Sequence, residues 1–223
     1  MQQHTETEEN YLKAIYHLSN VSVSSVNTSS IATSMSTTSA SVTDMLKKLA
    51  EKELINYEKY KGVKITRKGE KVALNIIRKH RLWEVFLTKV LKFEWDEVHT
   101  MAEELEHVSS DELIKRLEAY LEFPKFDPHG DPIPDQTGKL ELNDQMSLSN
   151  GEPGSKYIIT GVGEHSSAFL KHLAKYGLKP GITVSIAEIM EFDKSMLVKV
   201  SKEKFHLSLE VSKNILVKKY GTN

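Results

Sequence analysis

The sequence predicts a mainly α-helical protein with a small β component, and three observations lead to this fold class. Apolar residues recur at helical spacing between Tyr11 and Leu18 and again through residues 80–121. A short helix, a tight turn, a second helix and a hairpin are expected in succession between residues 27 and 66. From Glu152 onward the period becomes that of strands. We therefore expect three domains, over residues 1–73, 74–140 and 150–220.

The composition is that of a folded protein without a membrane segment. Of the 223 residues, 39% are hydrophobic and 27% charged, which is ordinary for a chain that buries a core. No apolar run approaches the ~18 residues that a membrane span needs, and the N-terminal residues MQQHTETEEN are polar and acidic. We expect a cytoplasmic location. The absence of cysteine excludes disulfides, thiolate zinc sites and thiol nucleophiles.

The charge is unevenly distributed, although the net charge is only −1. Nine Lys or Arg residues stand against two acids between Glu58 and Arg81, and ten acids against two bases between Glu94 and Glu122. One part of the surface can therefore attract phosphate and another can attract cations.

The first sixty residues predict a helix-turn-helix. A first helix begins near Thr7, with acids in its first turn. Asn27 and Thr28 can cap a short helix, a turn follows at Ser36 and Thr37, and a second helix runs over residues 39–50. Small hydroxyl residues at the start of that helix can approach DNA closely. The residues expected to face DNA here are Thr28, Thr37, Thr38, Ser39, Ser41, Thr43, Asp44 and Lys47.

The segment LINYEKYKGVKIT predicts a hairpin with a turn at Lys61 and Gly62. Its basic residues are Lys59, Lys61 and Lys64. Alone it fits a surface hairpin with solvated lysines. Directly after a helix-turn-helix it is typical of a wing that contacts phosphate.

The segment from His80 to His107 carries the residues best suited to a metal. On a helix turning ~100° per residue, the spacing of His99, Glu103, Glu106 and His107 places all four side chains within one stripe. His80 and Glu84, four residues apart, can face them from the preceding helix. Imidazole and carboxylate suit a divalent transition metal. The alternative is a solvated polar face.

The remaining segments divide by composition. Leu82, Val85, Phe86 and Val90, with Leu113, Leu117, Tyr120 and Leu121, form an apolar face for either a twofold partner or an internal core. Residues 123–139 hold four of the six prolines, so regular structure stops there and His129 falls in a turn. Residues 140–150 are expected to be a polar linker. KYIITGV, TVSIAEIM, MLVKVS and FHLSLE predict strands, and SSAFLKHLAKYGL predicts one short helix.

The chain resembles the diphtheria-toxin-repressor family of metal-dependent transcriptional regulators over almost its whole length. The motifs that carry the resemblance are TEENYLKAIY, ASVTDMLKKLAEKELINYEKYKGVKIT, IIRKHRLWEVFL, WDEVHTMAEELEHV and PKFDPHGDPIP. It implies a winged helix-turn-helix, a helical metal-binding and dimerisation domain, and a C-terminal SH3-like, FeoA-type β-barrel.

The resemblance also implies two sets of metal ligands. The primary set is Asn10, Glu103, Glu106 and His107, and the ancillary set is His80, Glu84 and His99, to which His165 of the C-terminal domain can be added. The first-helix ligand of the family is usually methionine or aspartate, whereas Asn10 offers only an amide oxygen. Without a sulfur ligand, Mn²⁺ or Fe²⁺, up to two per subunit, is the expected metal.

The function implied is that of a homodimeric repressor that binds a double-stranded operator with its metal and controls metal-uptake genes. Two alternatives stay open. One is a metal-independent winged-helix regulator. The other is a carboxylate-bridged di-metal enzyme, because Glu104 and His107 have the Glu-x-x-His spacing of such bundles. The only other such pair, Glu203 and His206, falls in a strand-like segment, so we do not expect an enzyme.

Overall fold

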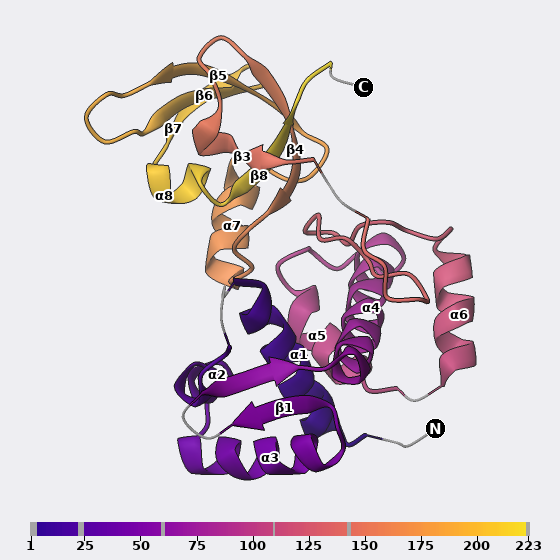
Figure 1. Ribbon diagram of the computed structural model, residues 1–223. Helices are drawn as coiled ribbons and strands as arrows, with labels where there is room; N and C mark the ends of the chain where they lie inside the picture. The colour runs from indigo at the N-terminus through magenta and orange to yellow at the C-terminus, as the bar shows by residue number, and fades with distance from the viewer. Residues whose placement is uncertain (1–3, 22–24, 59–60, 109, 142–143, 222–223) are drawn as a thin grey trace. The chain divides into compact units, whose positions relative to one another are not determined.

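The computed structural model describes residues 4–21, 25–58, 61–108, 110–141 and 144–221. They form two compact units, each treated separately below (Figure 1). Unit 1 comprises Met1–His80, Leu105–Ser109 and Pro134–Leu140, and unit 2 comprises Arg81–Glu104, Ser110–Ile133 and Glu141–Asn223. The predicted fold class is confirmed, with a helical N-terminal part and a C-terminal β-sheet. Among the described residues, no helix is both long and apolar enough to span a bilayer.

The first helix of unit 1, α1 (Glu6–Val21), begins one residue before Thr7, near which it was expected to begin. Thr5 and Glu8 form a reciprocal cap, in which Glu8 N donates to Thr5 Oγ1 at 3.2 Å and Thr5 N donates to Glu8 Oε2 at 3.1 Å. This capping box satisfies two backbone donors at the helix start, so the helix begins after Thr5 and not at Thr7.

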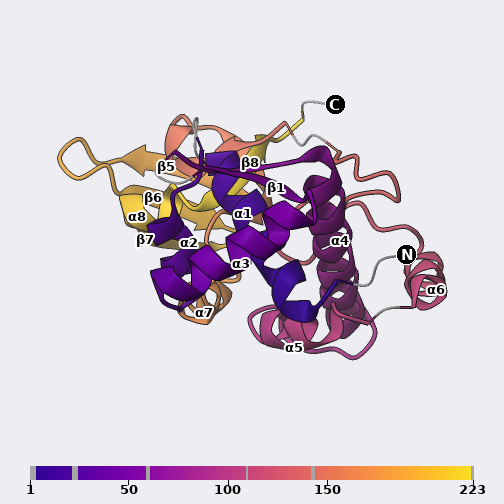
Figure 2. The same cartoon turned by 60° about the horizontal axis from the view of Figure 1, so that its bottom comes forward.

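The helix-turn-helix is confirmed in α2 (Thr28–Ser34) and α3 (Ser39–Glu51), which Figure 2 shows beside α1. Asn27 Oδ1 accepts from Ser30 N at 2.7 Å, and Thr38 Oγ1 accepts from Ser41 N at 3.2 Å. The Asn27 cap was expected from the sequence. The Thr38 cap was not predicted, although an oxygen-bearing side chain precedes each helix. The turn between the helices has Ser36 at φ +48°.

The hairpin consists of β1 (Ile55–Glu58) and β2 (Gly62–Ile65), paired antiparallel from Ile55↔Ile65 to Glu58↔Gly62. Gly62 has φ +91°, and a Cβ added to it would stand 2.7 Å from the carbonyl oxygen of Val26. This close approach lets Val26 and Val63 exchange two backbone hydrogen bonds, at 2.9 and 2.8 Å. The hairpin is thereby attached to a core whose wholly buried members include Leu12, Ile15, Ile31, Leu46 and Leu49.

Three helices follow the hairpin: α4 (Arg67–Lys89), α5 (Val98–Leu105) and α6 (Asp111–Tyr120). The division between the units falls within α4, after His80. In unit 2 the expected apolar face divides. Leu82, Val85, Leu117 and Leu121 pack in an internal core with Ile114 and Ile133, whereas Leu113 and Tyr120 keep 42% and 66% of their surface exposed.

The C-terminal part of unit 2 is a six-stranded antiparallel sheet in the order β3-β8-β4-β5-β6-β7. Its members are β3 (Met146–Ser147), β4 (Lys156–Val162), β5 (Thr183–Ile189), β6 (Met196–Val200), β7 (Glu203–Leu207) and β8 (Ile215–Lys219), with η1 (Leu148–Asn150), α7 (Ser167–Lys175) and α8 (Leu209–Ser212) between them. The expected strands at β4, β5 and β6 and the expected helix α7 are confirmed.

Two expectations for this part were wrong, and two strands were not predicted. The segment FHLSLE is a strand only to Leu207, because Ser208 caps α8 by accepting from Val211 N at 3.2 Å. The strands β3 and β8 were not predicted. The polar linker expected over residues 140–150 contains β3 and η1, since Leu148 is wholly buried in the core of the sheet.

The proline-rich segment of unit 2 is attached to the sheet at one turn. His129 O accepts from Val162 N of β4 at 2.9 Å. Gly130, with φ +90°, lies so close to β4 that an added Cβ would stand 2.0 Å from Thr160 O. Trp95, from the segment before α5, is buried in the core of the sheet. These contacts position the turn that carries Asp127 and His129.

Candidate metal centres

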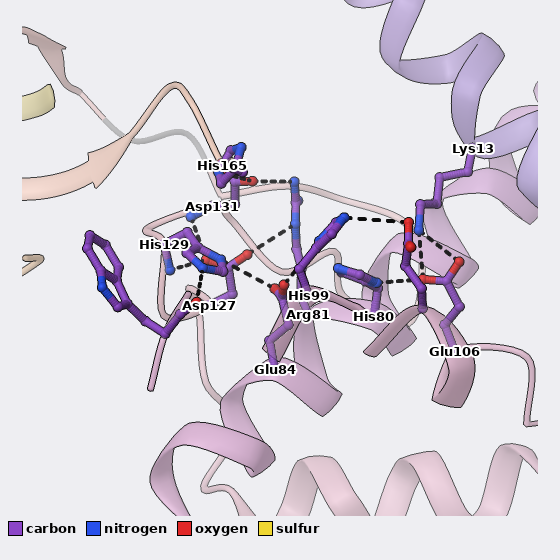
Figure 3. A network of polar contacts seen from close by, with 12 residues as sticks. Lys13, His80, Arg81, Glu84, His99, Glu106, Asp127, His129, Asp131 and His165 are labelled. Carbon is purple, nitrogen blue, oxygen red and sulfur yellow. Dashed lines mark hydrogen bonds and ion pairs between the residues drawn. The ribbon is translucent and has the colours of Figure 1, made fainter. Parts of the chain in front are cut away.

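Among the described residues, imidazoles and carboxylates gather in unit 1 and again in unit 2 (Figure 3). Cluster A, in unit 1, consists of Glu9, Lys13, His80, Glu106 and His107. Cluster B, in unit 2, consists of Glu84, Asp127 and His129.

Cluster A is built around the carboxylate of Glu106, which is wholly buried. Lys13 Nζ, from α1, donates to both of its oxygens at 2.8 and 2.7 Å, and His80 Nδ1 lies 2.6 Å from Oε2. Burial alone would raise the pKa of Glu106, but the hydrogen bond from His80 and the charge of Lys13 outweigh it and hold the pKa below its ordinary value. Glu106 is therefore an anion at neutral pH.

His107 completes cluster A and connects it to α1. Its Nδ1 lies 2.7 Å from Glu9 Oε2, and its Nε2 lies 3.8 Å from Glu106 Oε1. Asn10, the first-helix ligand inferred from the resemblance, is half-buried beside Glu9 on α1. The residue of α1 that contacts His107 is thus Glu9. The carboxylates of Glu9 and Glu106 and the ring of His107 offer oxygen and nitrogen donors of the types that Mn²⁺ and Fe²⁺ prefer.

Cluster B places three buried side chains so that one ligand atom of each lies within 4.8 Å of the others. Glu84 comes from α4, and Asp127 and His129 come from the proline-rich turn. Glu84 Oε2 lies 3.7 Å from His129 Nδ1. Asp127 Oδ1 accepts from the backbone nitrogens of His129 and Asp131, at 2.8 and 3.0 Å, which fixes the turn.

The electrostatics of cluster B favour a cation. Burial, Glu84 and Asp131 raise the pKa of Asp127 to about 7, against the opposing charges of Arg81 and His129. Burial alone would lower the pKa of His129. The hydrogen bond to Glu84 and the negative charges of Glu84 and Asp127 outweigh burial and raise the pKa to about 9. Buried carboxylates held this close together are stabilised by a positive charge between them. The donor set of two carboxylates and one imidazole fits a hard divalent metal.

Several residues surround cluster B. Arg81 Nη2 donates to Asp131 Oδ2 at 3.1 Å, and its Nε lies 3.6 Å from Asp127 Oδ2. His165 Nε2 lies 3.6 Å from Asp131 Oδ2 and, within the described residues, has no hydrogen-bond partner although it is covered from solvent. The His165 ring stands edge-on to the His129 ring, with centroids 5.3 Å apart. His165 therefore lies where a further ligand could stand.

The primary ligand set is brought together only in part, whereas one ligand atom each of His80, Glu84 and His99, the ancillary set, lies within 4.8 Å of the others. Glu106 and His107 lie together, and Glu84 lies 3.6 Å from His99 Nδ1. His80 stands one turn before Glu84 on α4 and contacts Glu106. Glu103 lies 3.5 Å from His99 Nε2, and both side chains are half exposed. Glu84 and Glu106 are buried, so they are not members of a solvated polar face.

Sequence reasoning missed Glu9, Lys13 and Asp127 as members of the clusters, and it placed His129 in a turn without a role. For Asp127 and His129 a signal was present in the motif DPHGD, where two ligand-type side chains share a tight turn. For Lys13 no signal was available, because its partner is 93 residues away.

The residues expected to face DNA are mostly on the surface of unit 1. Thr37, Thr38, Ser39, Ser41, Asp44, Lys47, Lys61 and Lys64 are exposed, Thr28 and Thr43 are half-buried, and Lys59 lies outside the described residues. Some of these groups already have partners. Lys47 pairs with Asp44 at 3.2 Å, and Lys61 pairs with Glu58 at 2.7 Å. Thr43 Oγ1 donates to Ser39 O at 2.8 Å.

Comparison with known families gives three matches along the chain. The iron dependent repressor N-terminal DNA binding domain matches residues 3–63, the iron dependent repressor metal binding and dimerisation domain matches residues 66–135, and the FeoA domain matches residues 146–219.

Individual relatives agree with these matches. The chain is 32% identical over 142 residues to the iron-dependent repressor IdeR of Mycobacterium tuberculosis, which is 64% of this chain and 60% of that protein. It is 30% identical over 168 residues to the diphtheria toxin repressor of Corynebacterium glutamicum, which is 75% of this chain and 72% of that protein. A solved manganese-dependent transcriptional repressor in complex with manganese aligns with a TM-score of 0.83 and 30% identity, over 95% of this chain and 99% of that one. With several curated relatives, the chain spans only 20% to 60% of their length.

A winged helix followed by buried clusters of imidazoles and carboxylates defines a class of DNA-binding regulators with metal sites. The chain belongs to the family of iron-dependent repressors, the diphtheria-toxin-repressor family that its sequence motifs indicate.

Proposed function

We propose that this chain is a metal-activated repressor that binds operator DNA as a homodimer, with Mn²⁺ or Fe²⁺ as corepressor, and that it controls genes for uptake of that metal. The observation that carries the proposal is cluster B, in which Glu84, Asp127 and His129 bring buried ligand atoms within 4.8 Å of one another. Burying carboxylates this close together destabilises the folded state unless a cation balances their negative charge. The relatives named above are an iron-dependent repressor and a diphtheria toxin repressor.

The two clusters would hold up to two metal ions per subunit. In cluster A the ligands would be Glu106, His107 and Glu9, with the Asn10 amide oxygen as a weaker donor on the same helix. In cluster B they would be Glu84, Asp127 and His129, with His99 and His165 beside them. A bound divalent cation supplies the positive charge that these carboxylates share. The remaining inferred ligands, His80 and Glu103, would orient the others.

Cluster A gives the proposal its link to DNA. Glu9 lies on α1, which packs against α2 and the wing strand β2 in unit 1. Ligands on α1 and on the segment bearing Glu106 and His107 would be held together when the site is filled. The position of the winged helix would then depend on metal, and a ligand that favours one arrangement shifts the population toward it.

The DNA and dimer contacts of the proposal rest on the exposed surface. The hydroxyl residues at the start of α3 and the wing lysines fit phosphate and base contacts in a major groove. The exposed Leu113, Tyr120 and Phe123 fit a twofold interface with a second copy. We propose the domain roles 1–73 for DNA binding, 74–140 for metal binding and dimerisation, and 150–220 for the FeoA-type barrel, all acting in the cytoplasm, where the operator is.

The alternatives make different demands. If the chain were a metal-independent regulator, clusters A and B would have no affinity for a metal ion. A di-metal enzyme needs a second helical Glu-x-x-His pair, whereas Glu203 and His206 lie in strand β7.

The test is DNA binding measured against metal under anaerobic conditions. A duplex selected from a randomised library in the presence of Mn²⁺ serves as the probe, and fluorescence anisotropy follows its binding with Mn²⁺, Fe²⁺ or Zn²⁺. We expect affinity to rise steeply with Mn²⁺ or Fe²⁺. Equal affinity with metal and with chelator would contradict the proposal.

A further inference from the structure

The ammonium group of Lys13 occupies the face of Glu106 that a metal ion would need. Its Nζ stands 2.8 and 2.7 Å from the two carboxylate oxygens, and the Lys13 side chain is only 16% exposed. Lys13 lies one helical turn after Glu9 on α1, so the two side chains project from the same face. A positive charge is thus tethered inside cluster A.

We propose that Lys13 is an internal competitor for the metal of cluster A and sets the concentration at which this chain responds to metal. The inference rests on the proposed function, because it assigns a regulatory role within the same site.

The competition follows from charge and space. A divalent ion ligated by Glu106 would stand within a few ångströms of an ammonium group that contacts both carboxylate oxygens, and two like charges at that distance repel strongly in a buried site. Lys13 must therefore either move toward solvent when metal binds, losing two charge-assisted hydrogen bonds, or stay and weaken the metal. Both outcomes lower the affinity of cluster A for the metal ion.

The same contact has a use in the metal-free protein. Glu106 is wholly buried, and a buried carboxylate without a positive partner is strongly destabilising. Lys13 and His80 provide that partner, at 2.7 and 2.6 Å from Oε2. The fold can therefore form before metal arrives.

The variant Lys13→Met tests the competition, because it keeps the length of the side chain and removes the charge. Mn²⁺ binding is measured by titration calorimetry in a His129→Ala parent, so that cluster B does not contribute to the isotherm. We expect the variant to bind Mn²⁺ about 10- to 100-fold more tightly than the parent, the range set by losing charge-assisted hydrogen bonds. Lys13→Arg, which keeps the charge, should stay within about threefold of the parent.

Lys52→Met is the matched control, since Lys52 Nζ also donates to a buried carboxylate of α1, Glu8 Oε1, at 2.6 Å, outside the cluster. Both Met variants should melt at lower temperature without metal, but only Lys13→Met should bind Mn²⁺ more tightly. If Lys13→Met does not fold by circular dichroism, Lys13→Gln takes its place with the same expected direction.

The outcomes separate the two proposals. Unchanged or weaker Mn²⁺ binding in the Lys13 variant, from a parent that binds Mn²⁺, overturns the inference alone. A parent and a wild-type chain that both bind no Mn²⁺ overturn the proposed function, and the inference with it.

Discussion

His129 donates a hydrogen bond from Nε2 to the backbone carbonyl oxygen of Trp95, at 2.7 Å. Because Nε2 carries the proton, Nδ1 is the nitrogen that faces Glu84, and in the neutral ring it carries the lone pair that a metal needs. The two rings are also stacked, with centroids 5.9 Å apart. The orientation of this candidate ligand is therefore set by a residue of the preceding segment.

Replacing His129 with alanine should remove one metal from the protein. We expect His129→Ala to lower the Mn²⁺ stoichiometry by one per subunit in titration calorimetry, because cluster B loses its only imidazole. His206→Ala, an exposed histidine on β7, is the control and should bind like the wild type. Equal stoichiometry in His129→Ala would exclude cluster B as a site.

Replacing Glu106 with glutamine, or His107 with alanine, should abolish metal-dependent DNA binding and leave the fold intact. Glu106 is the central carboxylate of cluster A, and the amide keeps its size while removing its charge. Anisotropy with a selected duplex would show the same affinity with and without Mn²⁺, while circular dichroism stays unchanged. Glu104→Gln, exposed on α5 two residues before Glu106, should retain the response. A variant of Glu106 that still responds to Mn²⁺ would contradict the assignment.

Replacing Gly130 with alanine should destabilise the protein by about 2–4 kcal/mol, because it combines an unfavourable φ with a buried steric overlap. The added Cβ would stand 2.0 Å from Thr160 O. Gly154→Ala is a matched control, since Gly154 has φ +80° with nothing within 4 Å of an added Cβ. It should cost only about 1 kcal/mol. Chemical denaturation of both variants measures the difference, and equal losses would mean that the contact with β4 does not matter.

Metal-free protein should become less stable as pH rises from 6 to 9. The pKa of Asp127 is raised to about 7 by burial and by Glu84 and Asp131, so its favourable contribution at low pH is lost as pH rises through 7. The pKa of His129 is raised to about 9, so the contribution of its charged form is lost as pH rises through 9.

The contributions of Asp127 and of His129 both lower the stability of the metal-free protein as pH rises. The positive charge of Arg81 opposes only part of the rise in the pKa of Asp127. Thermal denaturation with a strong chelator would follow the trend. Asp127→Asn should flatten the trend below pH 7, where the raised pKa of Asp127 contributes to it. A melting temperature that rises with pH over this range would argue against the buried charges described here.

Replacing Lys61 and Lys64 together with alanine should weaken DNA binding and reduce its salt dependence. Each phosphate contact contributes about one unit to the slope of log K against log salt concentration. We therefore expect the slope to fall by about two. Lys175→Ala, exposed on α7, should leave it unchanged. An unaltered slope in the double variant would mean that the hairpin does not contact DNA.

Much of the fold could be predicted because its signals are local. Asn27 and Thr38 cap their helices through atoms three residues away, and such spacing is visible in the sequence. Strand β8 was missed because ILVKK is short, and its pairing with β4 lies more than fifty residues away along the chain. Leu148 was assigned to a linker because its polar neighbours conceal its burial in the sheet.

The types of residue in the metal centres could be predicted from the sequence, but not which particular residues meet there. The helical spacing of His99, Glu103, Glu106 and His107 predicted one shared stripe, but α5 ends at Leu105, and Glu106 and His107 lie in the turn after it. Glu9 and Lys13 were missed because a contact between α1 and residues 106–107 spans more than ninety positions. Asp127 and His129 were missed because a turn has no periodicity from which the direction of a side chain can be inferred.

Trp95 is buried in the core of the C-terminal sheet, although it precedes that sheet by fifty residues along the chain. The sheet is thus not an interchangeable module that could be exchanged between relatives at the family boundary near residue 146. A graft made there would leave a tryptophan-sized void in the transplanted part and an uncovered indole in the recipient. A working graft of the sheet would therefore have to carry the segment before α5 with it.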